Sequence, residues 1–483
     1  MDRERTSEPT AAAEFRLSGW LVQPSLNRLS REAEVVQLEP KLMDVLVFLA
    51  SNAGQVVSKN EITDAVWPDV FITESVITRS IAGLRRAFGD DVRNPTFIET
   101  ISKRGYRLIA GVESPSHSAG VQFPPLPSDS AHAGSDVPLP YVIGQWVRGE
   151  RFYGRKSAIQ EVLGGNRNWI WLLGTRRIGK TSLLKQLELI AATSPELGFV
   201  PVFWDLQGAD RPEELHLDFA DALLDAEEHL ERAGISVAEI QSEDCFESLA
   251  RLRRALLSKN QRLLLLCDEV EELINLNRQD PSLLRKLRRA LQSREGIRSV
   301  LGSSSRLWKL ADAGEDTSPF LDGFTPPLAI GPLDADDARA LILQMQLPEV
   351  SRPGFDDAEI ERIRNLCGDH PYLIQMLCRH ALDHGSLDDA IEEVHNDRAV
   401  AFFFSVDFDL INETERALLI QLADDSSGAS ASRHETDAEP SAEIRTSLAN
   451  LVSLGLVRRD PSGRHSVGNE FLRHWLVTAL PGG

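Results

Sequence analysis

The sequence has few cysteines, no long apolar run and little positive charge for its length. Its four cysteines form no CxxC pair and lack zinc-ligand spacing, which excludes a disulfide framework and a zinc knuckle: Cys245, Cys267, Cys367 and Cys378. No stretch approaches the roughly 18 consecutive apolar residues of a membrane span, and the polar N-terminus has no apolar signal core. We therefore expect a cytoplasmic protein with reduced, mostly buried thiols and no membrane partner.

The formal net charge is -21, which excludes a protein that coats nucleic acid by bulk attraction. Any contact with DNA must therefore be local. Basic residues outnumber acidic ones between Arg79 and Arg107, and this is the segment that we expect to meet a phosphate backbone. The 483 residues, of which 42% are hydrophobic and 26% charged, are enough for several globular cores.

The patterns along the chain predict a multidomain protein. A stretch rich in Ser, Pro, Gly and His separates two regular regions, and apolar strand-like runs alternate with helical patterns after it. We expect a disordered tail at 1–13, an α+β winged helix-turn-helix domain at 14–110, a flexible linker at 111–140, an α/β P-loop nucleoside triphosphatase core with a parallel sheet at 141–332, a helical lid at 333–400 and a winged-helix-like domain at 401–483. The acidic helical stretch 205–241 is predicted to be a solvated face.

Residues 73–88 have the pattern of a DNA-recognition helix. Their buried stripe is predicted to be Ile77, Ile81, Leu84 and Phe88. The opposite face is predicted to carry Arg79, Ala82, Gly83 and Arg86. Two cationic side chains beside small residues suit a helix in a major groove about 12 Å wide. We expect Arg79, Ser80 and Arg86 to contact double-stranded DNA.

Two strand-like runs, 97–101 and 106–109, flank the turn Ser102-Lys-Arg-Gly105 and predict a hairpin with a cationic tip. Lys103 and Arg104 are the expected phosphate contacts of this wing. The alternative is that the basic residues are solvated charges on a winged helix that contacts another protein.

The N-terminal region resembles the OmpR/PhoB-type winged helix. The resemblance rests on Val36-x-Leu-x-Pro40, Gly54-Gln-Val-Val-Ser58, Val66-Trp67, Leu84-Arg-Arg86, Gly89-Asp-Asp91 and Ile98-Glu-Thr100 through Arg104-Gly-Tyr-Arg107. It implies a reading helix in the major groove and a loop near 67–74 that faces RNA polymerase. Because no phosphoacceptor domain precedes this region and no membrane span follows it, as one does in ToxR-like members, we do not expect phosphorelay input.

A strand-like run at 169–173 leads into Gly174-Thr-Arg-Arg-Ile-Gly-Lys-Thr-Ser182, the GxxxxGK[ST] pattern of a phosphate-binding loop. Glycines let backbone N–H groups surround phosphate oxygens, Lys180 reaches the β- and γ-phosphates, and the Thr181 hydroxyl binds Mg²⁺. A second apolar run, 263–267, ends in Asp268 and Glu269. We expect Asp268 in the magnesium shell and Glu269 beside the attacking water, so that Lys180 and Glu269 are the catalytic residues. The alternative is a strand end that meets solvent.

Further motifs resemble STAND-class, AAA-related ATPases of the archaeal type. They are Phe152-Tyr-Gly-Arg155, the loop above, Cys267-Asp-Glu-Val-Glu-Glu-Leu273, Leu301-Gly-Ser-Ser304 and Gly368-Asp-His-Pro-Tyr372. The resemblance spans about 148 to 480 and implies that the nucleotide holds the domains together as a switch. The implied ATP-binding residues are Gly174, Arg177, Gly179, Lys180, Thr181, Ser182, Arg155, His370 and Pro371. Asp369 stands where a second glycine is usual, which weakens the expected contact of the lid with nucleotide.

For other residues, two interpretations remain open. Ser303 and Ser304 fit a γ-phosphate sensor or a loop cap, and Arg306 fits an arginine finger or a surface residue. The C-terminal domain fits a lid that packs through Phe471, Trp475 and Leu476, or a second DNA reader that uses Arg458, Arg459, Arg464 and His465.

The combined motifs predict an ATP-dependent transcription regulator with slow hydrolysis as its reset and with ATP-dependent homo-oligomers. The alternatives are an ATP-driven DNA-acting enzyme, such as an initiator-like loader or a transposition helper, and a regulator that binds nucleotide without turnover. Complete motifs at Lys180, Thr181, Asp268 and Glu269 count against the last.

Overall fold

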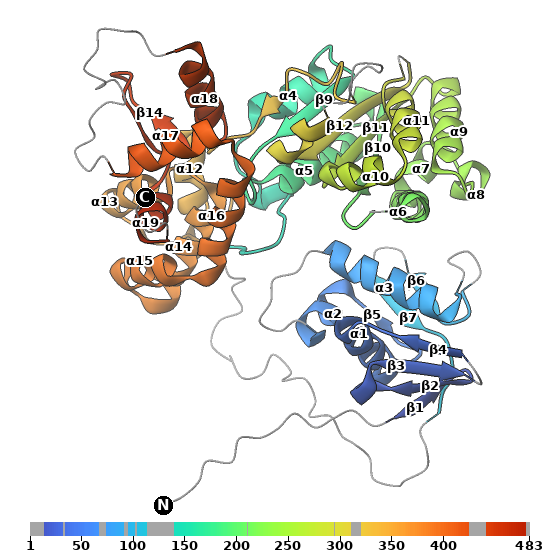
Figure 1. The fold of residues 1–483 in the computed structure, drawn as a ribbon. Coiled ribbons are helices and arrows are strands. Elements are labelled where there is room, and N and C mark those ends of the chain that lie inside the picture. The colour runs from blue at the N-terminus through green and yellow to red at the C-terminus, as the bar shows by residue number, and fades with distance from the viewer. Residues whose placement is uncertain are drawn as a thin grey trace, which may run out of the picture. The chain divides into compact units, whose positions relative to one another are not determined.

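The computed structural model describes residues 14–31, 34–66, 74–90, 95–101, 104–113, 140–209, 211–293, 295–310, 320–424 and 441–479. The chain forms two compact units, Met1–Asp136 and Val137–Gly483. Figure 1 labels the elements of both. The expected tail at 1–13 and most of the expected linker, 114–139, lie outside the described residues.

The N-terminal unit begins with an antiparallel sheet of strand order β4-β3-β2-β1-β8. Its strands are β1 (Phe15–Leu17), β2 (Trp20–Gln23), β3 (Arg28–Arg31), β4 (Glu34–Gln37) and β8 (Val112–Glu113). Strand β8 pairs with β1 through Leu17 and Val112. The expected domain end at 110 is therefore too early, because residues 112–113 complete this sheet instead of opening the linker.

Three helices and a second sheet form the rest of this unit (Figure 1). They are α1 (Pro40–Ser51), α2 (Lys59–Val66), α3 (Glu74–Phe88), β5 (Val56–Val57), β6 (Ile98–Ile101) and β7 (Gly105–Leu108), with strand order β5-β7-β6. The expected stripe of α3 is buried, and the ring of Phe88 stacks on Phe97 at 4.6 Å between centroids. The buried stripe of α3 thus fixes which of its faces points outward.

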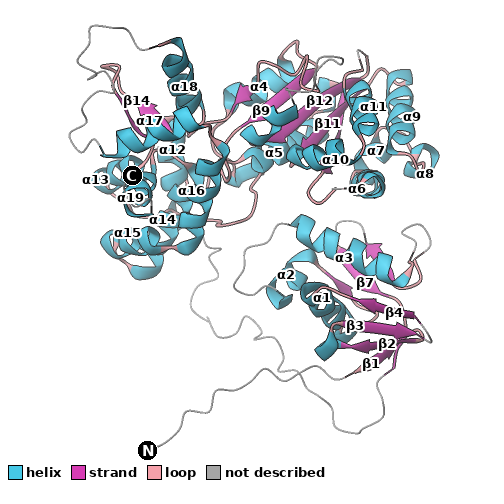
Figure 2. Ribbon diagram, in the orientation of Figure 1, coloured by secondary structure: helices cyan, strands magenta, loops and turns pink. Residues whose placement is uncertain are grey.

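The second unit is built on a five-stranded parallel sheet of order β10-β11-β12-β9-β13 (Figure 2). Its strands are β9 (Trp169–Leu173), β10 (Phe199–Asp205), β11 (Arg262–Asp268), β12 (Ile297–Ser303) and β13 (Leu328–Ala329). Strands β9, β10, β11 and β12 are mostly buried on both faces, as parallel strands between helices must be, whereas the short edge strand β13 is partly exposed. The predicted α/β fold with a parallel sheet is confirmed.

Successive residues of β11 pack on opposite layers of helices. Leu264 and Leu266 belong to the core with α4 (Lys156–Gly164) and α5 (Lys180–Thr193). Leu263, Leu265 and Cys267 belong to the core on the other face. The helices of that second layer are α6 (Pro212–Asp225), α7 (Glu227–Arg232), α8 (Val237–Ile240), α9 (Cys245–Ser258), α10 (Leu273–Gln279) and α11 (Pro281–Leu291).

The prediction of a solvated face for residues 205–241 is wrong for the inner side of these helices. Leu215, Phe219 and Leu223 of α6 are buried, and Phe219 packs edge-on against Trp204 at 4.8 Å. The acidic residues lie between apolar positions at helical spacing, so that the segment is amphipathic.

The helical lid follows the sheet. Its helices are α12 (Ala335–Ile342), α13 (Asp357–Cys367), α14 (Pro371–His384), α15 (Leu387–Asn396) and α16 (Arg398–Leu410). Because α16 is one continuous helix, the expected division at 400 falls inside it. The C-terminal elements are α17 (Glu413–Asp424), α18 (Ala442–Ser453), β14 (Val457–Arg459), β15 (His465–Val467) and α19 (Glu470–Ala479).

Helix α19 joins the C-terminal elements to the lid. Trp475 of α19 lies 5.7 Å from Phe408 and 6.2 Å from Phe404 of α16, between ring centroids. Phe471 and Leu476 are buried in the same core. The lid and the C-terminal elements are therefore packed on each other.

All four cysteines are buried free thiols within the second unit. Burial raises the pKa of Cys245 to about 12 and raises those of Cys267, Cys367 and Cys378 as well. Among the helices described, none is long and apolar enough to cross a bilayer.

Candidate functional site

The loop between β9 and α5 has the backbone of an anion-binding site. Arg177 and Gly179 adopt positive φ angles of 58° and 100°, and α5 begins at Lys180. A side chain at Gly174 would place its Cβ 2.8 Å from both the Ile330 carbonyl oxygen and the Ile178 side chain. Positive φ angles at the N-terminus of a helix are typical of loops whose backbone N–H groups bind phosphate oxygens.

Lys180 and Thr181 carry the polar side chains of this loop. The Lys180 ammonium donates to the carbonyl oxygens of Gly174 (3.1 Å) and Thr175 (3.0 Å). The Thr181 hydroxyl donates to Asp268 Oδ2 at 2.6 Å. A hydroxyl and a carboxylate oxygen at this separation form the oxygen-rich donor set that Mg²⁺ prefers. The residues present therefore fit the implied ion.

Several carboxylates crowd the carboxyl ends of β10 and β11. Asp205 and Asp268 are register partners in these neighbouring strands. Burial, and then the charge of Asp205, raise the pKa of Asp268. Burial, and then the charges of Glu271 and Asp268, raise the pKa of Glu269, which has a positive φ of 50°. A cation at this edge would relieve the repulsion among these groups.

The residues expected to flank the nucleotide lie around the loop but are engaged with protein. The Arg155 guanidinium donates to the carbonyl oxygens of Ile178 (3.1 Å) and Pro332 (3.2 Å), and burial lowers its pKa to about 10. The Arg177 guanidinium lies 4.3 Å from the centre of the Tyr372 ring. Ser182 Oγ accepts from the Val147 N–H at 3.1 Å. These residues hold the loop in shape.

His370 and Pro371 lie at the N-terminus of α14, close to the same loop. His370 is buried, and neither ring nitrogen has a hydrogen-bond partner among the described residues. Burial, with the charges of Arg155 and Arg177, lowers its pKa to about 3, so the ring is neutral. A neutral ring whose two nitrogens are buried without a hydrogen-bond partner among the described residues is an unusual feature that packing alone does not explain.

Ser303 and Ser304 end β12 next to the loop. Ser303 Oγ accepts from the Trp171 indole at 2.8 Å and donates to the Ser304 carbonyl oxygen. Ser304 donates its N–H and its hydroxyl to Glu271 Oε1. Both serines therefore tie the strand end to its neighbours, which matches the loop-cap interpretation.

Asp407 of the lid is a site residue that the sequence analysis missed. Its Oδ1 accepts the backbone N–H of Arg176, inside the phosphate-binding loop, at 3.2 Å. Gly174, Thr175 and Ser304 line a small cavity with Asp407. The sequence did contain a hint: Asp407 follows Phe403 and Phe404 by four and three residues, so it lies on the same buried side of the helix as they do.

In the N-terminal unit, Arg86 is exposed on α3 and Arg104 is exposed in the turn before β7. Arg79 lies on α3, but its side chain is outside what the structure describes, as are Lys103 and the loop 67–73 expected to face RNA polymerase. The expectation for Ser80 is wrong, because its side chain is only 3% exposed within the core.

Gly83 was expected on the outward face of α3 but packs inward, and Arg85, counted in the basic segment, is also buried. A Cβ at Gly83 would lie 2.7 Å from the Leu42 side chain, so this glycine faces α1 and permits a close helix approach. Arg85 is buried and donates to the Ile98 carbonyl oxygen (3.0 Å) and to Thr100 Oγ1 (2.7 Å). Arg85 therefore adds no cation to the outer surface of the basic segment.

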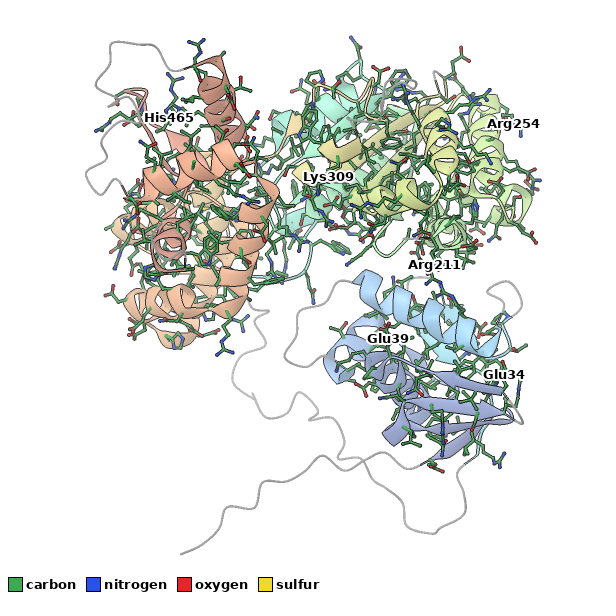
Figure 3. All side chains as sticks on the ribbon, in the orientation of Figure 1. Glu34, Glu39, Arg211, Arg254, Lys309 and His465 are labelled. Atoms are coloured by element: carbon green, nitrogen blue, oxygen red, sulfur yellow. The ribbon has the colours of Figure 1, made fainter. Side chains whose placement is uncertain are left out.

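The hairpin β14–β15 carries the residues considered for a second DNA contact. Figure 3 labels His465 on it. Arg458 and Arg459 are exposed, while Arg464 pairs with Asp460 at 3.1 Å. The hairpin thus presents three arginines to solvent, one of them paired with Asp460.

Residues 32–108 match the family described as transcriptional regulatory protein, C terminal. Over 118 residues the chain is 41% identical to the transcriptional activator CadC of Escherichia coli, a match that covers 23% of each protein. It is 32% identical over 120 residues to the cholera toxin homolog transcriptional activator of Vibrio parahaemolyticus, covering 24% of this chain and 38% of that protein. The chain thus spans under a quarter of the first relative's length. The N-terminal unit contains a winged-helix domain of the OmpR/PhoB type, as predicted.

Solved structures resemble both units. The DNA-binding domain of E. coli CadC is 40% identical, with 21% of this chain and 97% of that chain covered and a TM-score of 0.20. The Walker-type ATPase of Pyrococcus abyssi is 17% identical, covering 68% of this chain and 97% of that chain with a TM-score of 0.46. The Aeropyrum pernix Orc1 protein in complex with DNA is 16% identical, covering 68% and 93%, with a TM-score of 0.34.

Proposed function

We propose that this protein is a DNA-binding transcription regulator whose activity depends on ATP bound by its α/β unit. The winged helix supplies the contact with double-stranded DNA, through α3 and the wing. The proposal of nucleotide binding rests chiefly on the 2.6 Å hydrogen bond between Thr181 and Asp268, beside the phosphate-binding loop. Both parts lie in one chain, so occupancy of the second can regulate the first.

The residues of the loop have separate tasks in this proposal. The backbone N–H groups and Lys180 bind the phosphates, while Thr181 and Asp268 hold Mg²⁺, which supplies charge neutralisation when bound. Glu269 accepts a proton from the attacking water. Its raised pKa makes it a stronger base near neutral pH than an ordinary carboxylate.

Titration calorimetry with Mg²⁺ and ATP on the full chain tests the binding step. Lys180→Ala should weaken ATP binding by about 10- to 100-fold, the value of a lost charge-assisted hydrogen bond. Glu269→Gln should bind ATP but hydrolyse it poorly. The control is Lys156→Ala, which removes an exposed lysine of α4.

A reporter gene driven by a bound promoter tests the switch. The two variants should move its output in opposite directions, because Lys180→Ala lacks bound ATP while Glu269→Gln keeps it bound. If both regulate like wild type while Lys180→Ala has lost ATP, the winged helix acts alone and the proposal fails.

The exposed arginines of the β14–β15 hairpin favour a second candidate function, that of an ATP-driven enzyme that binds DNA at two sites. Hydrolysis strongly stimulated by DNA would support this candidate. Slow hydrolysis that ignores DNA would support the regulator.

A further inference from the structure

The lid helix α16 places a carboxylate against the phosphate-binding loop. Asp407 is 3% exposed, and its Oδ1 accepts the N–H of Arg176 at 3.2 Å. Its Oδ2 is also buried and has no hydrogen-bond partner among the described residues. A buried acid left half satisfied costs stability, so this position calls for a reason beyond packing.

The groups around Asp407 are those that would surround a bound phosphate. Lys180 and Arg176 favour its charged form, whereas burial is the larger effect and raises its pKa to about 7. The cavity beside it is lined by Gly174 and Thr175 of the same loop. The carboxylate therefore meets the N–H group and the cations that the loop would offer to a nucleotide.

We propose that Asp407 is an internal competitor of the nucleotide, which it opposes by taking the Arg176 N–H that a phosphate oxygen would accept. This inference rests on the proposed nucleotide binding by the loop. An N–H aimed at one acceptor cannot serve the carboxylate and a phosphate oxygen equally, and two anions this close repel each other. ATP binding therefore displaces α16 from the loop.

Contacts of α16 carry this displacement to the C-terminal elements. Phe404 and Phe408 pack against Trp475 of α19. The Arg416 guanidinium of α17 donates to the carbonyl oxygens of Phe408 (3.0 Å) and Asp409 (2.7 Å) at the end of α16. When α16 moves, α17 and α19 must move with it or lose these contacts. Asp407 thus links the nucleotide to the lid.

Nucleotide affinity of Asp407→Asn tests the competition. Asparagine keeps the size and one oxygen acceptor but removes the charge, so ATP should bind about tenfold more tightly, within the usual range for coupled sites. The matched control is Asp409→Asn, an exposed acid of the same helix, which should bind like wild type. Unchanged or weaker binding by Asp407→Asn overturns the proposal.

Two further measurements distinguish failure of the Asp407 proposal from failure of the proposed nucleotide binding. If wild type and Lys180→Ala bind ATP equally, the proposed nucleotide function itself is wrong, whatever Asp407 does. Hydrogen exchange of α16 in the wild-type chain needs no variant to fold. Amides of residues 398–410 should exchange faster when ATP is added, and unchanged or slower exchange would show that the helix keeps its contact.

Discussion

Replacing two neighbouring arginines of α3 should affect two different properties. Arg85 is buried and donates to the Ile98 carbonyl oxygen and the Thr100 hydroxyl, whereas Arg86 is exposed on the expected DNA-facing side. Arg85→Ala leaves a buried carbonyl oxygen without its donor. The free energy of unfolding of the N-terminal unit should fall by about 2 to 3 kcal/mol, the value of hydrogen bonds to a charged group.

For a domain of this size, that loss lowers the melting temperature by roughly 10 °C or more. Arg86→Ala should change the unfolding free energy by less than about 0.5 kcal/mol. It should instead weaken DNA binding by about 1 to 3 kcal/mol if the side chain reaches a base. Thermal unfolding followed by circular dichroism, and fluorescence anisotropy on labelled DNA at low temperature, measure the two effects on residues 1–136.

The opposite result would refute this division of roles. If Arg85→Ala keeps the wild-type melting temperature and loses DNA affinity, Arg85 acts at the surface and the described orientation of α3 is wrong. If Arg86→Ala unfolds the domain, its exposure has been misassigned.

Two other predictions concern the wing and assembly. Lys103→Ala should reduce the salt dependence of DNA binding by about one counterion while barely changing sequence preference, and an unchanged slope in a salt titration would exclude a phosphate contact. ATP with Mg²⁺ should raise the mass of the full chain in light scattering if the nucleotide completes an interface between copies, whereas an unchanged monomer would confine switching to one chain.

Much of the fold could be predicted because its elements are long and periodic. The strand at 169–173 and helix α3 have apolar residues at the spacing that burial requires. Strand β8 could not be predicted in this way, since two residues contain no period. Its place in the sheet comes from pairing with β1.

The errors on α3 have a simple cause. Ser80 follows Ile77 by three residues and precedes Leu84 by four, so the helical period puts it in the buried stripe. Asp407 is the harder case. Periodicity alone places it inside, but its partner Arg176 lies 231 residues away, and local spacing contains no information on such a contact.

The four buried thiols make the second unit its own reporter of opening. Their raised pKa values and lack of exposure protect them from alkylation while the second unit stays folded. Native labelling rates should therefore follow transient opening of the second unit, and the N-terminal unit, which contains no cysteine, should contribute no signal. A single cysteine introduced on the exposed face of α3 would label at once, so one dye could be placed on this helix without removing any native thiol.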